Sequence, residues 1–274
     1  MTILIVLIGL LISHVATGFR HLRDFRWLLW PMHRMRRQFP DLPWLAFVMV
    51  PTTAIIAVVL ATWLMTALLG VVGWALLALA VFIFTLGPRD LDRDVGVLLA
   101  RATSESDDEV RSTAAAMHLD TDNSTAIEAS AAVFHAALSR WFGILFWFVL
   151  LGIPGAVVYR LTRVALQEDD LNADEIDWLA RLRMILDWPV LALLTLSAAM
   201  CTDLDKVYRA WVEHRKAHGP WLLTPALLDR VAGAIDPDCQ SFDEGLECGH
   251  RIVWRMLIMW LVVLSVLLIA GWLV

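Results

Sequence analysis

The sequence WFGILFWFVLLGIPGAVVYR, residues 141–160, is apolar enough to enter a bilayer but is interrupted near its middle. The interruption runs from Gly152 to Gly155 and contains Pro154, which removes a backbone donor, between two conformationally free glycines. In hydrocarbon, backbone groups freed in this way are tolerated only where protein or water satisfies them. We therefore expect a non-helical kink or re-entrant turn that packs against other helices. Tyr159 and Arg160 follow it and offer polar groups at membrane depth.

The composition is that of an integral membrane protein. Hydrophobic residues make up 59% of the 274 residues and the mean hydropathy is +0.67, whereas soluble domains contain about 45–50% apolar residues. The apolar runs predict an all-α, polytopic helical membrane protein with cytoplasmic helices and a Gly/Pro-broken membrane helix. We expect residues 1–274 to form one integral membrane domain in a lipid bilayer.

The charged residues are unevenly distributed although the net charge is only −6. Residues 20–37 hold six arginines and one acid. Basic residues beside a span are retained in the cytoplasm, so the cluster most simply sets orientation, and a contact with lipid headgroups is the alternative. Nucleic-acid binding is not expected, because these arginines are interleaved with the apolar residues 27–30 beside a span.

The three cysteines predict neither a disulfide framework nor a metal site. Cys201, Cys239 and Cys248 are odd in number and irregularly spaced. The last two are too far apart for the usual zinc-binding spacing. We expect free thiols and no bound metal.

The apolar runs divide the chain into five parts. Residues 2–15 are too short for a simple span, and Trp44–Leu69 and Val71–Leu86 predict a helical hairpin that turns at Gly70 and Gly73. Acidic residues 166–180 read as a loop with a short helix, and 185–200 as a short span or an in-plane helix. No internal repeat is expected. The predicted parts are 1–86, 87–140 (cytoplasmic helices), 141–200 (broken or short membrane segments), 201–250 (cytoplasmic helices) and 251–274 (the last span).

The orientation follows from the basic residues. Arg251 and Arg255 at the start of the last span place that end in the cytoplasm. Residues 17–43 and 87–140 are then cytoplasmic and Val274 is periplasmic. The two segments at 141–159 and 185–200 either both cross the membrane or both dip and return, and the Gly-Ile-Pro-Gly break slightly favours partial crossings.

A polar stripe marks the alanine-rich helix predicted from Ala126 to Leu138. Glu128, His135 and Ser139 fall within about 20° of one line at helical spacing. The stripe is a candidate binding site. A solvated face or a satisfied polar contact between helices is the alternative.

Five short fragments occur in order along the chain, while the phosphate-binding loop, HExxH, GxSxG and EF-hand motifs are absent. The fragments are Gly87-Pro88-Arg89-Asp90-Leu91, Ile127-Glu128-x-Ser130, Phe146-Trp147, Gly152-x-Pro154-Gly155-x-x-x-Tyr159-Arg160 and Leu186-Asp187-Trp188-Pro189. In this order they resemble the CobD/CbiB superfamily and, within it, the AmpE family most closely. The resemblance covers most of the chain.

The resemblance implies an inner-membrane protein of bacteria and two contrasting functions. The CobD/CbiB enzymes join an aminopropanol to a corrinoid carboxylate with ATP, whereas AmpE is a signalling protein encoded beside the amidase AmpD and linked to β-lactamase induction. Several of the enzymes' polar positions are occupied differently here, at 93–94, 133–135 and 161–165. A regulatory protein of cell-wall recycling without a cofactor, with AmpD or a muropeptide as partner, is therefore favoured.

Two other functions remain open. One is a membrane-surface ligase or transferase that uses ATP and Mg²⁺, and the other is a carrier for a muropeptide or lipid-linked molecule. No catalytic residue is assigned. Glu128, His135, Tyr159 and Arg160 are expected to converge, with Arg89 at the cytoplasmic mouth. The ligand-binding candidates are Arg89, Asp90, Glu128, His135, Tyr159, Arg160 and Asp187.

Overall fold

The computed structural model confirms an all-α, polytopic membrane protein. Among the described residues no strand occurs, and four helices are long and apolar enough to cross a membrane: 47–85, 126–151, 173–201 and 242–267. The described residues are 9, 29–30, 33–34, 38, 42, 44–86, 90–101, 107–121, 123–168, 171–219, 223–235 and 239–270. Arg89, Val274 and nearly all of the segments 2–15 and 20–37 lie outside them, so the predictions made for these residues stay predictions.

Contacts divide the chain into two compact units, each assembled from separate stretches of sequence. The first unit contains residues 1–88, 143–187 and 268–274, and the second contains 89–142 and 188–267. The first unit is built around two helical hairpins. The second contains the helices predicted to be cytoplasmic, residues 188–201 of a predicted membrane segment and most of the last span.

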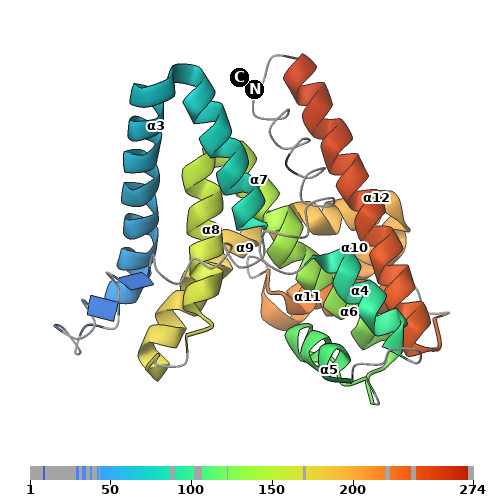
Figure 1. Ribbon diagram of the computed structural model, residues 1–274. Coiled ribbons are helices and arrows are strands. Elements are labelled where there is room, and N and C mark those ends of the chain that lie inside the picture. The colour runs from blue at the N-terminus through green and yellow to red at the C-terminus, as the bar shows by residue number, and fades with distance from the viewer. Residues whose placement is uncertain are drawn as a thin grey trace. The chain divides into compact units, whose positions relative to one another are not determined.

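The first hairpin is α3, Leu45–Thr85, which reverses direction at Gly70 (Figure 1). Gly70 has φ 60° and ψ −143°, a backbone conformation that other residues rarely adopt. Beyond the turn, Gly73 lies against the carbonyl oxygen of Met65. Residues eight apart in one straight helix are separated by about 12 Å, so this contact requires the chain to fold back. The hairpin predicted from the glycines is confirmed.

The second hairpin is formed by α7, Gly143–Leu151, and α8, Ile153–Ala165 (Figure 1). Gly152 between them has φ 68° and ψ −150°, which confirms the predicted non-helical break. Gly155 lies against the carbonyl oxygen of Trp147, again eight residues earlier. Pro154 stands in the first turn of α8, where its missing N–H costs no helical hydrogen bond.

The two hairpin tips share one sequence. Leu68-Leu69-Gly70-Val71-Val72-Gly73 and Leu150-Leu151-Gly152-Ile153-Pro154-Gly155 both read LLGxxG, with nearly the same torsion angles at the first glycine and the same close approach at the second. The expectation of no internal repeat is therefore wrong at this short scale. Six residues within long apolar helices barely change the composition, so composition does not reveal this short repeat.

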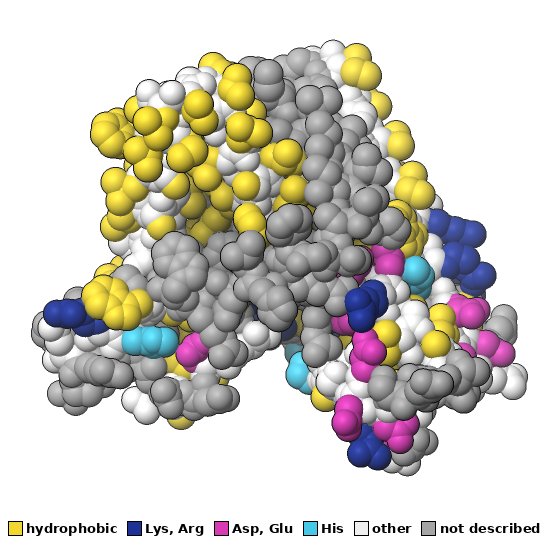
Figure 2. Space-filling model, in the orientation of Figure 1, with side chains coloured by type: hydrophobic (Ala, Val, Ile, Leu, Met, Phe, Trp, Pro, Cys, Tyr) yellow, Lys and Arg dark blue, Asp and Glu magenta, His cyan; other side chains and the backbone are white. Residues whose placement is uncertain are grey.

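Aromatic contacts hold the first unit together, while its outer surface is apolar. The Phe82 and Phe148 rings join the two hairpins with centroids 4.8 Å apart, and Phe47 meets Trp178 at 5.9 Å. Figure 2 shows hydrophobic side chains covering the visible face of α3. Exposed Ile56, Leu60 and Trp63 belong to α3 and are suited to contact lipid.

Helix α9, Ala173–Cys201, is longer than the short helices predicted at 166–180 and 185–200. The described residues 166–168 and 171–172 are not helical, as expected of a loop, but the helix that follows has 29 residues and is not short. Asp174 and Glu175 stand at its N-terminus, where the helix dipole favours negative charge. The apolar run at 185–200 continues the same helix through Pro189. Its 29 residues extend roughly 43 Å, which is long enough for a full crossing.

The second unit packs several helices at close distance. They are α4 (Leu91–Leu99), α5 (Asp107–Ala116), α6 (Ala126–Ala137), the π-helix η4 (Leu138–Phe142), α10 (Leu204–His218), α11 (Ala226–Ile235) and α12 (Phe242–Ile269). Gly245 of α12 lies against the Ala126 backbone, and Gly249 lies against Ser130. This Gly-xxx-Gly contact confirms the expected close packing of the alanine-rich helix. The three cysteines are free thiols, and the Cys239 and Cys248 sulfurs lie 2.8 Å apart.

Candidate functional site

A buried polar cluster joins α8 to α9 in the first unit. Asp187, only 1% exposed, accepts hydrogen bonds from the Tyr159 hydroxyl at 2.9 Å and from Arg163 Nη2 at 2.8 and 2.9 Å. Arg183 Nε donates a hydrogen bond to Asp187 Oδ2 at 3.3 Å. Arg163 Nη2 also reaches the Tyr159 hydroxyl at 2.9 Å. We refer to Tyr159, Arg163, Arg183 and Asp187 as the Asp187 cluster.

Helical spacing explains how the cluster is assembled. Tyr159 and Arg163 stand one turn apart on α8, and Arg183 and Asp187 stand one turn apart on α9, so each pair shares a helix face. Gly143 of α7 lies directly against the Tyr159 ring, where any larger residue would displace it. The hairpin thus fixes the ring and, through it, the hydroxyl that contacts Asp187.

Asp187 lies two residues before Pro189, which stands inside α9. Pro189 has no N–H to offer the carbonyl of Ile185, so the helical hydrogen-bond ladder is interrupted there. The indole Nε1 of Trp147 donates to the Leu186 carbonyl at 3.0 Å. The second hairpin therefore contacts α9 twice, through this backbone carbonyl and through the neighbouring Asp187 carboxylate.

The cluster holds more positive than negative charge. Two guanidinium groups meet one carboxylate. Arg163 Nε is buried and has no acceptor among the described residues. Arginine forks bind carboxylates and phosphates equally well in geometry. The two guanidinium groups therefore carry one positive charge more than the Asp187 carboxylate neutralises.

The predicted site residues fall into both units. Tyr159 and Asp187 meet directly, and the half-buried Arg160 is the next residue on α8. Asp90, Glu128 and His135 belong to the second unit. The expected convergence of the two groups stays a prediction.

Each of the three predicted residues in the second unit has a local partner. Asp90 caps α4 by accepting from the Asp92 amide at 3.3 Å. Glu128 forms a capping box with Thr125 at the start of α6. His135 Nε2 lies 2.7 Å from Asp229 of α11. The polar stripe thus contains a helix cap and a polar contact between helices, the alternative that the sequence left open.

The second unit contains another polar cluster that the sequence did not single out. Asp92 Oδ1 lies 2.6 Å from His250 Nε2 and accepts from Trp254 Nε1 at 2.8 Å. Buried Asp94 binds Arg140 at 2.7 Å, and Arg140 stands in the π-helix η4. These contacts join α4 to α12 and to the end of α6.

Sequence reasoning therefore missed Arg163, Arg183 and the partners of Asp92 and Asp94. Arg163 was identifiable as the cation one turn after Tyr159, and Arg183 as the cation one turn before Asp187. The contacts of His250 and Arg140 join residues 158 and 46 positions apart. No local pattern identifies such pairs.

Comparison with protein-family models, with curated proteins and with solved structures gives no match for this chain.

Proposed function

We propose that this chain is a regulatory protein of a bacterial inner membrane, AmpE-like, that links cell-wall recycling to β-lactamase induction. The observation that carries the proposal is the Asp187 cluster, in which two arginines share one buried carboxylate close to Pro189 of α9. The AmpE resemblance includes Tyr159 and Asp187 of this cluster. A muropeptide, whose peptide stem bears carboxylates, is the ligand that we assign to it.

The signalling step is a competition between anions. A ligand carboxylate binds Arg163 and Arg183, and Asp187 loses partners that offset the cost of burying its charge. Because Asp187 belongs to α9 and Arg163 to α8, the exchange shifts the contact between the second hairpin and α9. A ligand shifts such an equilibrium only by its difference in affinity for the two states. AmpD is the downstream partner that the resemblance suggests.

The test measures ligand binding to two variants. One weakens the hold on Asp187, the competing carboxylate, and the other removes Arg163, which binds the ligand. Tyr159→Phe removes one bond to Asp187, so the carboxylate competes less well and muropeptide affinity should rise several-fold. Arg163→Gln removes the receptor, and affinity should fall at least tenfold. The measurement is the thermal unfolding of the purified protein titrated with an anhydro-muropeptide, because a ligand at about 100 Kd stabilises by about 2.7 kcal/mol.

The matched control ligand is the same muropeptide with its carboxylates amidated, which should leave the unfolding temperature unchanged. Equal stabilisation by both ligands, or by neither, would overturn the proposal. A rise in affinity for Tyr159→Phe and a loss for Arg163→Gln together exclude a purely structural ion pair, because such a pair does not change ligand affinity.

A ligase or transferase that uses ATP and Mg²⁺ is the second candidate, and the surplus of arginine over carboxylate favours it too. The same guanidinium groups suit a phosphate in charge and geometry. Stabilisation by Mg-ATP together with release of ADP or AMP would identify this function. Stabilisation by the muropeptide alone would exclude it.

A further inference from the structure

Helix α10 begins at the polar edge of the membrane spans in the second unit. It starts at Leu204, and only two residues separate it from the end of α9 at Cys201. The Cys201 sulfur lies 3.9 Å from the sulfur of Met259. Met259 is one turn beyond Arg255, the last charged residue in the described part of α12. The start of α10 is therefore level with the boundary between charged and apolar residues on α12.

The side chains of α10 fall on distinct faces. Val207, Ala210 and His214 are buried, and His214 Nε2 lies 3.4 Å from the Thr224 hydroxyl. Four other side chains fall within an arc of about 60° around the helix axis, away from the buried face. We call them the outer row: Leu204, Tyr208, Trp211 and Arg215. Leu204 is 62% exposed and Tyr208 is 59% exposed, so the outer row presents apolar surface on a helix rich in charge.

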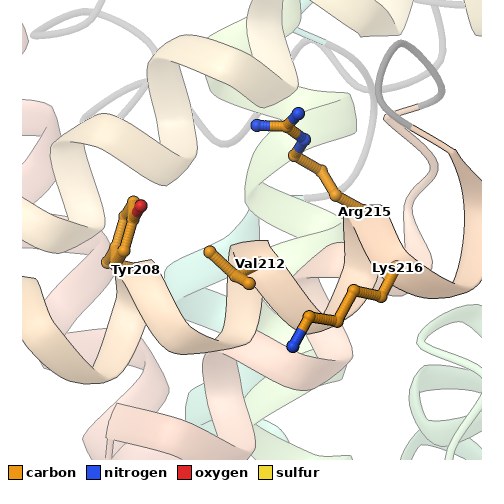
Figure 3. Close-up of a pocket in the computed structure, with 4 residues that line it drawn as sticks. All are labelled: Tyr208, Val212, Arg215 and Lys216. Carbon is orange, nitrogen blue, oxygen red and sulfur yellow. The ribbon is translucent and has the colours of Figure 1, made fainter.

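The outer row combines aromatic rings with a cation. The Tyr208 and Trp211 rings lie 6.0 Å apart, and the guanidinium carbon of Arg215 lies 4.6 Å from the centre of the Trp211 ring. Tyr208 and Arg215 also line a shallow, open depression of about 380 Å³ with Val212 and Lys216. Figure 3 shows these four side chains along one side of α10. A cationic edge thus borders an apolar and aromatic surface.

The surplus charge of this surface is positive. Glu213 is the only carboxylate in the last three turns of α10, and Arg230 of α11 binds it at 3.9 Å. Among the ion pairs of the described residues, Arg209, Arg215 and Lys216 have no carboxylate partner. Cations in the last turn also complement the helix dipole, but that effect does not account for exposed Leu204 and Tyr208.

We propose that α10 lies in the membrane interface and binds the headgroups of anionic phospholipids. Tyrosine and tryptophan favour the boundary between headgroups and acyl chains, so the apolar part of the outer row rests there. Arg215 and Lys216 extend to the lipid phosphates, their apolar stems lying along the same boundary. The start of α10 at the polar edge of the spans places it at this depth.

The test compares hydrogen exchange of α10 in the full-length protein under two lipid conditions. Amides of residues 204–218 should exchange more slowly in nanodiscs that contain phosphatidylglycerol than in nanodiscs of phosphatidylcholine alone. Each cation near the surface strengthens anionic-lipid association about fivefold. The double variant Arg215→Gln/Lys216→Gln should therefore weaken it by about 25-fold and abolish the difference between the two lipids.

The matched control is Arg93→Gln/Arg111→Gln, which removes the same charge from α4 and α5 and should keep the lipid-dependent protection. Tyr208→Ser should speed exchange in both lipids, because it removes apolar contact rather than charge. Identical exchange of the wild-type protein in both lipids would overturn the proposal. So would loss of protection in the control variant, or full protection by inorganic phosphate in phosphatidylcholine nanodiscs, which would indicate a site for free anions.

Discussion

The two hairpins of the first unit have the same tip and carry different side chains. Both turn at a glycine with positive φ, at Gly70 and Gly152, and both close on a second glycine three residues later. The described arms of α3 contain no charged residue. The second hairpin supplies Tyr159 and Arg163 to a buried carboxylate. A hairpin with this tip therefore folds without a polar cluster, so the tip does not explain why the second hairpin has one.

The cost of the cluster supports a role beyond folding. Charges inside a membrane are expensive and are retained mainly where they act on ions or ligands. Replacing a buried ion pair with well-packed apolar side chains is often neutral or stabilising. The first hairpin demonstrates that LLGxxG folds between apolar arms alone. We interpret the Asp187 cluster as the functional part of the second hairpin.

The largest effect should come from removing the shared carboxylate. Asp187→Asn leaves two arginines without their anion, and the free energy of unfolding should fall by about 3–5 kcal/mol. Reversible unfolding in mixed micelles measures this loss. In the first hairpin, Thr53→Ala removes only the hydrogen bond from the Thr53 hydroxyl to the Met49 carbonyl of the same helix. The free energy of unfolding should fall by less than about 1 kcal/mol. Equal losses would mean that Asp187 is no more costly to remove than a neutral side chain.

The second glycine of each tip should tolerate no added methyl group. Gly73→Ala and Gly155→Ala push a Cβ against the backbone carbonyls of Met65 and Trp147, and each should cost about 2–3 kcal/mol by overpacking. Unfolding of the two variants under one condition tests whether the tips are equivalent. A loss at one tip without a loss at the other would show that the shared sequence does not give shared packing.

The first glycine of each tip should show a smaller loss that arises only from the backbone. Nothing lies within 4 Å of a Cβ added at Gly70, and Gly152 has only the Pro154 ring at that limit. Alanine at either site must adopt positive φ at a cost of about 1–2 kcal/mol. The two changes in unfolding free energy should agree within error, and a stabilising alanine at either position would be incompatible with the positive φ.

The smallest effect should come from Tyr159→Phe. It removes one hydroxyl from a carboxylate that keeps both arginines, so we expect a loss of about 1 kcal/mol. Gly143→Ala, which displaces the same ring, should cost more than removing the hydroxyl alone. If Tyr159→Phe instead costs as much as Asp187→Asn, the hydroxyl rather than the arginines holds the carboxylate in place.

The sequence predicted the parts of this fold that depend on local chemistry. Gly70 and Gly152 were identifiable as turns because glycine, flanking apolar length and proline are all local signals. The run at 185–200 was separated from the acidic segment because charge and Pro189 both suggest a break. The structure instead continues α9 through both. A proline lowers the stability of a helix locally but does not end it where neighbouring helices supply contacts.

The candidate site was only partly predictable for a similar reason. Tyr159 and Asp187 were identified from fragments of sequence, and they do meet. Glu128 and His135 were grouped by helical periodicity. Periodicity shows that residues lie on the same side of a helix, but it does not show which residues they contact. Their partners are Thr125 and Asp229. Arg163 was identifiable as the cation one turn after Tyr159, but the sequence does not show that this turn of α8 faces α9.

The central claim is that the Asp187 cluster transmits a signal and does not merely hold two helices together. The most direct measurement is β-lactamase induction in a strain that depends on this protein, with two variants compared at equal membrane abundance. Asp187→Asn/Arg163→Gln removes both charges of the pair, with a side chain of the same shape at 187 and a shorter neutral side chain at 163. Gly73→Ala lowers stability in the charge-free hairpin. We predict that the first variant abolishes induction and that the second supports it normally. Normal induction by both variants would contradict the claim, as would equal loss of induction in both.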